Sequence, residues 1–362
     1  MKKQAREYTR RLAGAFAALC LAGTVHAQSS VTLYGVADAS LRYLTGANKA
    51  DDSQFSLANG AISQSRWGMR GREDLGGSTY AMFDLQSGFN LPNGSMSSAG
   101  VIFNRNAYVG IGNPTVGSIK LGIMDNPTYQ LLTDGWDPLT VGNYLQNEWL
   151  PVAFSGALRG GSNMALYTLD RGPLTMRGSF SLGGVAGNFN SGTLKVLAIA
   201  YDPTPFGAEA GFVQGYNANN FSQRAFNIQL RFKGLQAWEF WLGYYNDDDH
   251  TGSVDAFLTG NAAVGTAIGR KDNAFVAGAA YYVTPAFRLT GAAYYDNAQN
   301  VSAVNGADGK RYTYVALAEY FLSRQVTLYG TVDYNRVTGA TTNEEPNGKD
   351  QFGVGTGIRY RF

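Results

Sequence analysis

The last thirteen residues, Asp350 to Phe362, restrict the possible folds of this chain more than any other stretch. One alternate set is mostly apolar: Phe352, Val354, Thr356, Ile358, Tyr360 and Phe362. The set between them is small or basic: Gly353, Gly355, Gly357, Arg359 and Arg361. Successive side chains of a β-strand point to opposite faces, so a strand here has one apolar and one charged face. That pattern suits a barrel strand between lipid and water, although an edge strand of a soluble sandwich would alternate in the same way.

The same alternation recurs along the whole chain and decides between these two interpretations. A clear case is the run from Phe226 to Lys233, in which Asn, Gln, Arg and Lys alternate with Phe, Ile and Leu. Sixteen segments are predicted as strands: 31–43, 65–74, 79–91, 101–112, 117–125, 163–169, 173–183, 194–201, 208–216, 224–233, 237–246, 273–283, 287–297, 311–322, 326–337 and 351–362. An even number of strands is typical of single-chain outer-membrane barrels.

The connections between these segments alternate in length. Short turns are predicted at 75–78, 113–115, 284–286 and 323–325, whereas 45–64, 247–272 and 338–349 are longer polar links. A barrel with one short-turned end and one long-looped end has the polarity of an outer-membrane protein. After residue 27 no apolar run approaches about 18 residues, the length of a membrane helix. The sequence therefore predicts an all-β fold, a 16-stranded antiparallel transmembrane β-barrel.

The N-terminus has the pattern of an export signal. Five basic residues within the first eleven precede a short apolar run, Leu12 to Gly23, and Val25-His26-Ala27 resembles a small-residue cleavage site. Residues 1–27 are therefore predicted to be a cleaved signal peptide and residues 28–362 the barrel domain. Cleavage would remove five of the 29 Lys/Arg and one of the 27 Asp/Glu, which leaves 24 and 26 and a net charge of −2.

The composition of residues 28–362 argues against several functions. Cys20 lies in the predicted signal, so the barrel domain has no thiol and no disulfide, and His250 is its one histidine. A near-neutral charge argues against a nucleic-acid partner. The run Asp247-Asp248-Asp249-His250 could hold a divalent cation weakly or be a solvated loop. Because no catalytic constellation can be assembled, we expect no enzyme activity, no cofactor and no metal.

Four motifs together resemble one protein family. They are Ser30-Val-Thr-Leu-Tyr-Gly35, Ser65-Arg-Trp-Gly-Met-Arg-Gly-Arg-Glu-Asp-Leu-Gly76, Phe103-Asn-Arg-Asn-Ala-Tyr-Val-Gly110 and the terminal Phe362. The chain is similar over nearly its whole length to the trimeric general porins of the Gram-negative outer membrane, and most similar to the β-proteobacterial branch. The resemblance implies a cell outer-membrane location, a homotrimer, contacts with outer-membrane lipid and lipopolysaccharide, and recognition of Phe362 by the barrel-insertion machinery.

The long connection from Asn126 to Ser162 breaks the strand rhythm. It contains Pro127, Pro138 and Pro151, which cannot donate to a strand ladder, and several aromatic residues. In the family that the chain resembles, the third loop folds into the barrel lumen and narrows the pore; from the residues alone an extracellular lid is equally possible. Trp136 and Trp149 could bind solute or pack the loop against the wall.

The resemblance implies a basic wall opposite an acidic third loop. Candidate constriction residues are Arg66, Arg70, Arg105 and Arg159 on the wall and Asp134, Asp137 and Glu148 in the loop. Two departures weaken the acidic assignments: the family's Pro-Glu-Phe-Gly loop motif is absent, and Ile123-Met124 stands where a lumen arginine is common. The alternative is that these charges only anchor the loop through salt bridges.

The predicted function is a water-filled channel for passive diffusion of ions and small hydrophilic solutes, with a mild preference for anions. Two alternatives stay open at this point: a channel tuned to one substrate, and an outer-membrane barrel that is an adhesin or a structural anchor instead of a channel.

Overall fold

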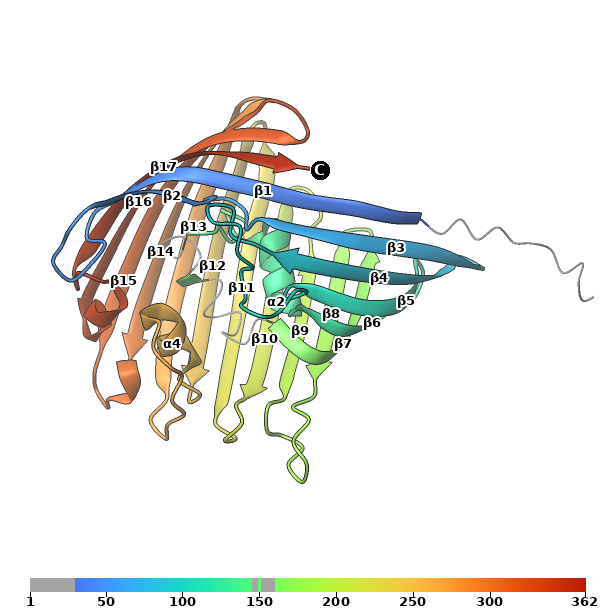
Figure 1. The fold of residues 1–362 in the computed structure, drawn as a ribbon, viewed down its shortest axis with the longest axis horizontal. Coiled ribbons are helices and arrows are strands. Elements are labelled where there is room, and N and C mark those ends of the chain that lie inside the picture. The colour runs from blue at the N-terminus through green and yellow to red at the C-terminus, as the bar shows by residue number, and fades with distance from the viewer. Residues whose placement is uncertain (1–29, 145–148, 151–159) are drawn as a thin grey trace, which may run out of the picture.

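The computed structural model describes residues 30–144, 149–150 and 160–362, and in them the chain forms one closed antiparallel sheet (Figure 1). Its strands are β1 (Ser30–Leu44), β2 (Gln54–Asn59), β3 (Arg66–Gly76), β4 (Thr79–Gly88), β5 (Asn106–Asn113), β6 (Gly117–Asp125), β7 (Gly160–Arg171), β8 (Leu174–Ser181), β9 (Leu194–Tyr201), β10 (Phe206–Tyr216), β11 (Ser222–Leu235), β12 (Trp238–Asp249), β13 (Arg270–Thr284), β14 (Phe287–Gln299), β15 (Gly309–Phe321), β16 (Val326–Gly339) and β17 (Asp350–Arg361). Each of the sixteen predicted strands is present.

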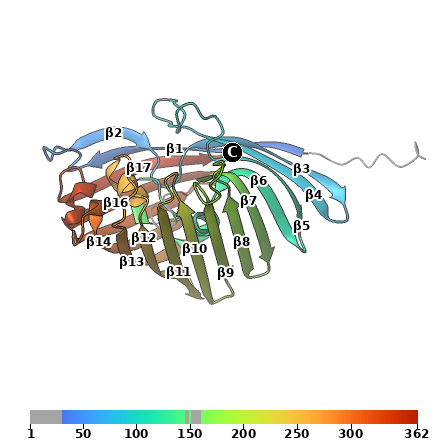
Figure 2. The same ribbon diagram turned by 90° about the horizontal axis from the view of Figure 1, so that it is seen from below.

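The barrel closes where β1 meets β17, and the two strands lie side by side in Figure 2. Their register runs from Val36 opposite Arg361 to Leu44 opposite Gly353. On its other edge β1 pairs with β3 through residues 30–36 and with β2 through residues 39–44. β2 and β3 pair with different parts of the same edge of β1 and together occupy one strand position. The seventeen strands therefore form a sixteen-stranded barrel.

Burial confirms the predicted alternation. On β11, Asn227 and Gln229 are fully buried, whereas Ile228 and Leu230 are 44% and 51% exposed. A soluble sheet would bury the apolar set, because burial of apolar surface is what stabilises a water-soluble core. Here the apolar set faces outward and the polar set inward, which is the arrangement of a barrel whose outer face contacts lipid.

The two ends of the barrel differ as the turn lengths predicted. The connections β3–β4 and β7–β8 are tight turns, and Gly76, Gly77 and Gly172 supply positive φ angles that other residues rarely adopt. The opposite end carries the long connections, which contain the helices α4 (Ser253–Thr259), η2 (Val301–Ala303) and η3 (Ala340–Glu344).

Three predicted segments differ in the structure. The link 45–64 contains β2, which the sequence analysis missed because six residues give too short an alternation. The fourth predicted strand begins at Asn106 rather than at Val101, and its partner β4 ends at Gly88 rather than at Leu91. The reason is local: the Asn104 side chain accepts a hydrogen bond from the Gly88 amide at 2.9 Å and so replaces a strand partner there.

The third loop begins with α2 (Pro127–Leu131) and η1 (Leu132–Trp136). Asn126 caps α2, because its side-chain oxygen accepts from the Tyr129 amide at 3.0 Å. The helix lies against β8, β9 and β10, in the middle of the view in Figure 1. Across the described ranges, no helix is long and apolar enough to cross a membrane.

Candidate functional site

A polar cavity of about 370 Å³ lies between the third loop and the wall formed by β3, β4, β17 and Arg105, the residue just before β5. Four arginines line it: Arg66, Arg105, Arg359 and Arg361. Among the described residues that line the cavity, Asp125 is the one carboxylate. Because these residues come from strands at both ends of the chain, the closure of the barrel creates the cavity.

Arg66 and Arg105 are held mainly by neutral oxygens. Arg105 donates from Nε to Gln86 Oε1 at 2.9 Å and from a terminal nitrogen to Gln64 Oε1. Arg66 donates to the Gln64 carbonyl at 3.0 Å. The nearest ion-pair contact joins Arg105 to Asp125 at 3.8 Å. Amide oxygens orient a guanidinium without neutralising it, so the described residues leave most of the positive charge at this wall uncompensated.

Arg359 and Arg361 extend this basic wall onto β17. Arg359 donates to Ser63 Oγ and Thr327 Oγ1, both at 3.3 Å, and lies 3.8 Å from Glu319. Arg361 is exposed, and no carboxylate of the described chain lies within 4.0 Å of it. The sequence analysis placed both on the polar face of the last strand, yet it did not bring them to Arg66, because only the strand register across the closed barrel does so.

Arg70 lies on the same face of β3 as Arg66, four residues nearer the short-turned end. At 3.2–3.4 Å per strand residue the two Cα atoms are about 13 Å apart. The Arg70 guanidinium lies over the Tyr34 ring at 4.9 Å, and Arg70 does not line the cavity. The structure therefore separates Arg70 from Arg66 and Arg105.

Asp134 faces the wall of the barrel. Its Oδ2 lies 2.6 Å from a terminal nitrogen of Arg177 on β8, and the Asp134 side chain is 54% exposed. This pair is the kind of loop-anchoring salt bridge that the sequence analysis kept as its alternative. An exposed pair contributes only about 0–1 kcal/mol, so its main effect is on the local field.

Asp137 is placed differently from the prediction. It is fully buried, and its carboxylate accepts from the amides of Leu139 and Val141 and from the Tyr294 hydroxyl, at 2.9–3.0 Å. Burial raises the pKa of Asp137 to about 6. With both oxygens occupied by these donors, Asp137 organises the third loop and is not open to a solute.

The aromatic residues of the third loop pack against inward-facing side chains. Trp136 lies under the Arg231 guanidinium at 4.5 Å, and the Gly135 carbonyl accepts from Arg231 at 2.8 Å and from Trp241 Nε1 at 3.0 Å. Trp149 donates from Nε1 to Thr313 Oγ1 at 2.8 Å. Both loop tryptophans are buried, at 3% and 0% exposure, so their described positions favour packing over solute binding.

Further along the loop, Tyr144 reaches the first strand. Its hydroxyl lies 2.5 Å from Ser40 Oγ, and the Arg42 guanidinium covers its ring at 4.1 Å. The Asn143 side chain donates to the Gly60 carbonyl at 2.6 Å. The described part of the third loop thus contacts strands from β8 round to β1. The predicted site residues Glu148 and Arg159 lie outside the described residues.

The acidic run Asp247-Asp248-Asp249 divides between the two faces of β12. Asp247 accepts from Gln223 at 2.7 Å, Asp249 accepts from Thr251 and Val254, and Asp248 lies 3.5 Å from His250. Within the part of the chain that the structure describes, no group of three or more His, Cys, Asp or Glu is arranged to hold a metal ion.

The fold and this inward-facing basic cavity define the class of protein: a transmembrane β-barrel with an apolar outer wall and a charged interior. A family model described as Gram-negative porin matches residues 13–340, so the chain belongs to that family. Membership in this family, the barrel and the relatives named below place the protein in the cell outer membrane.

Two curated relatives align with part of the chain. An outer membrane porin protein of Bordetella pertussis is 41% identical over 118 residues, which is 29% of this chain and 30% of that protein. Outer membrane porin protein 32 of Delftia acidovorans is 39% identical over 119 residues, 33% of each. The aligned segments span about a third of these relatives. Both organisms are β-proteobacteria, which confirms the branch that the sequence resembled.

Solved structures share the fold over almost the whole chain. An anion-selective porin from Comamonas acidovorans matches with a TM-score of 0.72 and 22% identity, covering 92% of this chain and 100% of that one. The trimer form of OmpT from Vibrio cholerae matches with a TM-score of 0.67 and 13% identity, over 92% and 99% of the two chains. At these identities the likeness establishes the common barrel.

Proposed function

We propose that the barrel is a water-filled channel for passive diffusion of ions and small hydrophilic solutes. The observation that carries the proposal is the polar cavity inside the wall, lined by four arginines and edged by neutral amides and hydroxyls. Such a lining solvates hydrophilic solutes. Membership in a porin family supports the same function, and the absence of enzyme activity stays a prediction.

The third loop is proposed to fold into the lumen and to narrow the channel. Its support is the set of contacts from Gly135, Trp136, Tyr144 and Trp149 to inward-facing side chains on opposite sides of the barrel. A loop fixed at several points has little freedom to swing outward as a lid. The proposed constriction lies between this loop and the wall of Arg66, Arg105, Arg359 and Arg361.

The channel is proposed to prefer anions. The charges at the cavity carry this step, because four guanidinium groups face one carboxylate among the described residues that line it. One unpaired charge in water is worth on the order of 1 kcal/mol to an ion about 4 Å away, and salt screens it within about 10 Å. The preference is therefore several-fold rather than absolute. The solved porin from Comamonas acidovorans is itself named anion-selective.

A homotrimer is proposed as the assembled form, in line with the trimer form of the OmpT relative. The outer face differs around the barrel: exposed residues of β5 and β6 are aliphatic, including Val109, Ile111, Ile119 and Leu121, whereas β11–β15 carry many aromatic rings. Aromatic residues gather where a membrane meets water, so the side of β11–β15 is assigned to lipid and the aliphatic side to the subunit contact.

Reconstitution tests the channel directly. The mature protein in planar bilayers should give discrete conductance steps, and in liposomes it should admit small sugars and exclude large ones. A barrel that inserts, as judged by its strand-rich circular dichroism, and yet gives no steps and no uptake would support the adhesin or structural alternative. Uptake limited to one solute among several of equal size would support the substrate-tuned channel.

A further inference from the structure

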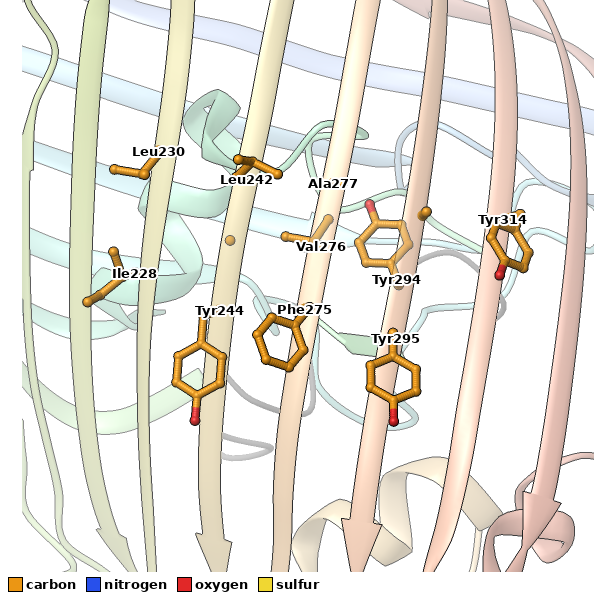
Figure 3. Close-up of a pocket in the computed structure, with 12 residues that line it drawn as sticks. Ile228, Leu230, Leu242, Tyr244, Phe275, Val276, Ala277, Tyr294, Tyr295 and Tyr314 are labelled. Atoms are coloured by element: carbon orange, nitrogen blue, oxygen red, sulfur yellow. The ribbon is translucent and has the colours of Figure 1, made fainter.

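The outer face of β11–β15 carries an apolar groove that the channel does not use. Its volume is about 530 Å³, and Figure 3 shows the residues along it on neighbouring strands. Ala277 and Ala293 form the floor, because they are directly paired and have the smallest side chains there. Leu242, paired with Ala277, flanks one side, and Tyr314, paired with Ala293, flanks the other. One row of the strand register thus builds a trough between larger side chains.

A row of aromatic rings closes the groove on the side of the long loops. Its members are paired in register on β12 to β15 and are Tyr244, Phe275, Tyr295 and Tyr312. The ring centroids of successive members lie 5.1, 6.3 and 5.1 Å apart, and Figure 3 shows the first three side by side. Tyrosine and tryptophan gather where the apolar part of a membrane meets its headgroups. The aromatic row therefore marks the level of that boundary.

Polar side chains follow one outward position above the aromatic row. Asn246, Asn273, Asn297 and Lys310 are paired in sequence across β12 to β15, and Tyr244 donates to the Asn273 side chain at 2.7 Å. Lys271 lies one outward position higher on β13. We call these five residues the polar shelf. It offers amide groups and two ammonium groups just where lipid headgroups would lie.

The two lysines of the polar shelf are exposed and lack a protein counterion. No carboxylate in the described ranges lies within 4.0 Å of either ammonium group. Asp248 is the cross-strand neighbour of Lys271, but its carboxylate lies 3.5 Å from His250 instead. Arg224 and Arg336 add two further exposed outward bases on β11 and β16. The shelf is therefore a local positive surface above an apolar trough.

We propose that the groove and the polar shelf together bind a lipid with a net negative phosphate headgroup, from the leaflet at the long-looped end. One acyl chain would lie on Ala277 and Ala293, and the phosphate would lie at Lys271 and Lys310. Lys310 is four strand residues from Tyr314, about 14 Å, a span that a lipid's glycerol backbone and first methylenes cover.

The charge of the polar shelf favours a lipid over a second copy of the chain as the occupant of the groove. A subunit packed into the groove would cover the polar shelf and leave two ammonium groups without partners, which is unfavourable. A lipid buries its chain in the groove and brings the countercharge with it. The proposal depends on the barrel facing lipid and not on conduction, so a channel that fails to conduct would leave it intact.

The test uses the whole barrel, stripped of lipid in neutral detergent and titrated with phosphatidylglycerol and phosphatidylcholine of identical acyl chains. Native mass spectrometry counts the bound lipids. The parent should retain the anionic lipid preferentially. Lys271→Gln with Lys310→Gln should lower its retention about fivefold for each lysine and leave the zwitterionic lipid unchanged. Ala277→Phe, which fills the trough, should lower retention of both lipids, and Ala293→Phe is a second variant of the same kind.

Matched variants elsewhere on the outer face control for general effects. Lys195→Gln removes an outward lysine of β9, and Ile199→Phe puts the same ring on the outward face of that strand. Both should bind like the parent. Equal retention of the two lipids by the parent, or unchanged retention in the double lysine variant, would overturn the proposal. So would an Ala277→Phe variant that changes the number of subunits and not the number of lipids.

Discussion

At the scale of single residues, the two acidic side chains predicted for the constriction have different roles because their surroundings differ. Asp134 is half exposed and has one cationic partner, whereas Asp137 is buried and accepts three hydrogen bonds. The sequence gives both the same neighbourhood, a proline-rich aromatic loop. Only the fold shows which carboxylate turns inward to the loop's own amides.

This contrast gives a prediction. Asp137→Ala leaves the Leu139 and Val141 amides and the Tyr294 hydroxyl without their acceptor, and each buried unpaired donor costs about 1–3 kcal/mol. Asp134→Ala removes an exposed pair worth about 0–1 kcal/mol. We expect Asp137→Ala to loosen the third loop, seen as broadened single-channel conductance and faster loop proteolysis, and Asp134→Ala to leave both nearly unchanged. Equal effects of the two variants would refute the anchoring role of Asp137.

At the scale of elements, alternation predicted all sixteen long strands, since each has enough residues to show a period of two. It missed β2 and α4, because both are too short to show a clear period. It also left the third loop open between lid and insert, because its contacts with Arg231, Trp241 and Thr313 join residues about 100 or more positions apart. Such pairings depend on the three-dimensional register and not on local pattern.

The last strand yields the second prediction. Phe362 exchanges two backbone hydrogen bonds with Gly35, at 3.0 and 3.1 Å, and its ring covers Gly35 so closely that a Cβ there would lie 2.4 Å from it. Deleting Phe362 should lower outer-membrane yield in cells. Phe362→Ala keeps the backbone pair and removes the ring, so it separates ring recognition from barrel closure.

Two assays distinguish the deletion of Phe362 from Phe362→Ala: insertion into the outer membrane in cells, and folding of the purified protein in detergent. If the insertion machinery reads the ring, as the resemblance implies, both variants insert poorly in cells, while Phe362→Ala still folds in detergent. Normal outer-membrane yield of the deletion variant would contradict any assembly role for Phe362.

At the scale of the whole molecule, the sequence predicted the barrel, its polarity and part of the basic wall. It did not predict that Arg359 and Arg361 join Arg66 and Arg105, because these pairs meet only when the two ends of the chain close the barrel. Nor could it separate Arg70 from Arg66, since alternation assigns a face to a residue but not a height within the lumen.

The proposed homotrimer is the third prediction. Under mild detergent, native mass measurement should give three copies of the chain. Replacing aliphatic outer positions of β5 and β6 with charge, as in Val109→Glu, should shift the protein toward monomers because a charge buried without a partner is costly. The same change at Leu230 on β11 should not. A monomer as the only species of the parent would contradict the assembly.

The central claim is a water-filled channel whose basic wall favours anions, and the zero-current potential in a salt gradient measures it most directly. The zero-current potential of the parent should have the sign expected when anions permeate more readily than cations. Arg105→Glu and Arg361→Glu should each move it toward cation preference, because each reverses a charge at the cavity and so changes the permeability ratio several-fold. Arg324→Glu, the same reversal in a short turn outside the cavity, should leave it unchanged. A parent without anion preference, or wall variants with the parental potential, would contradict the account.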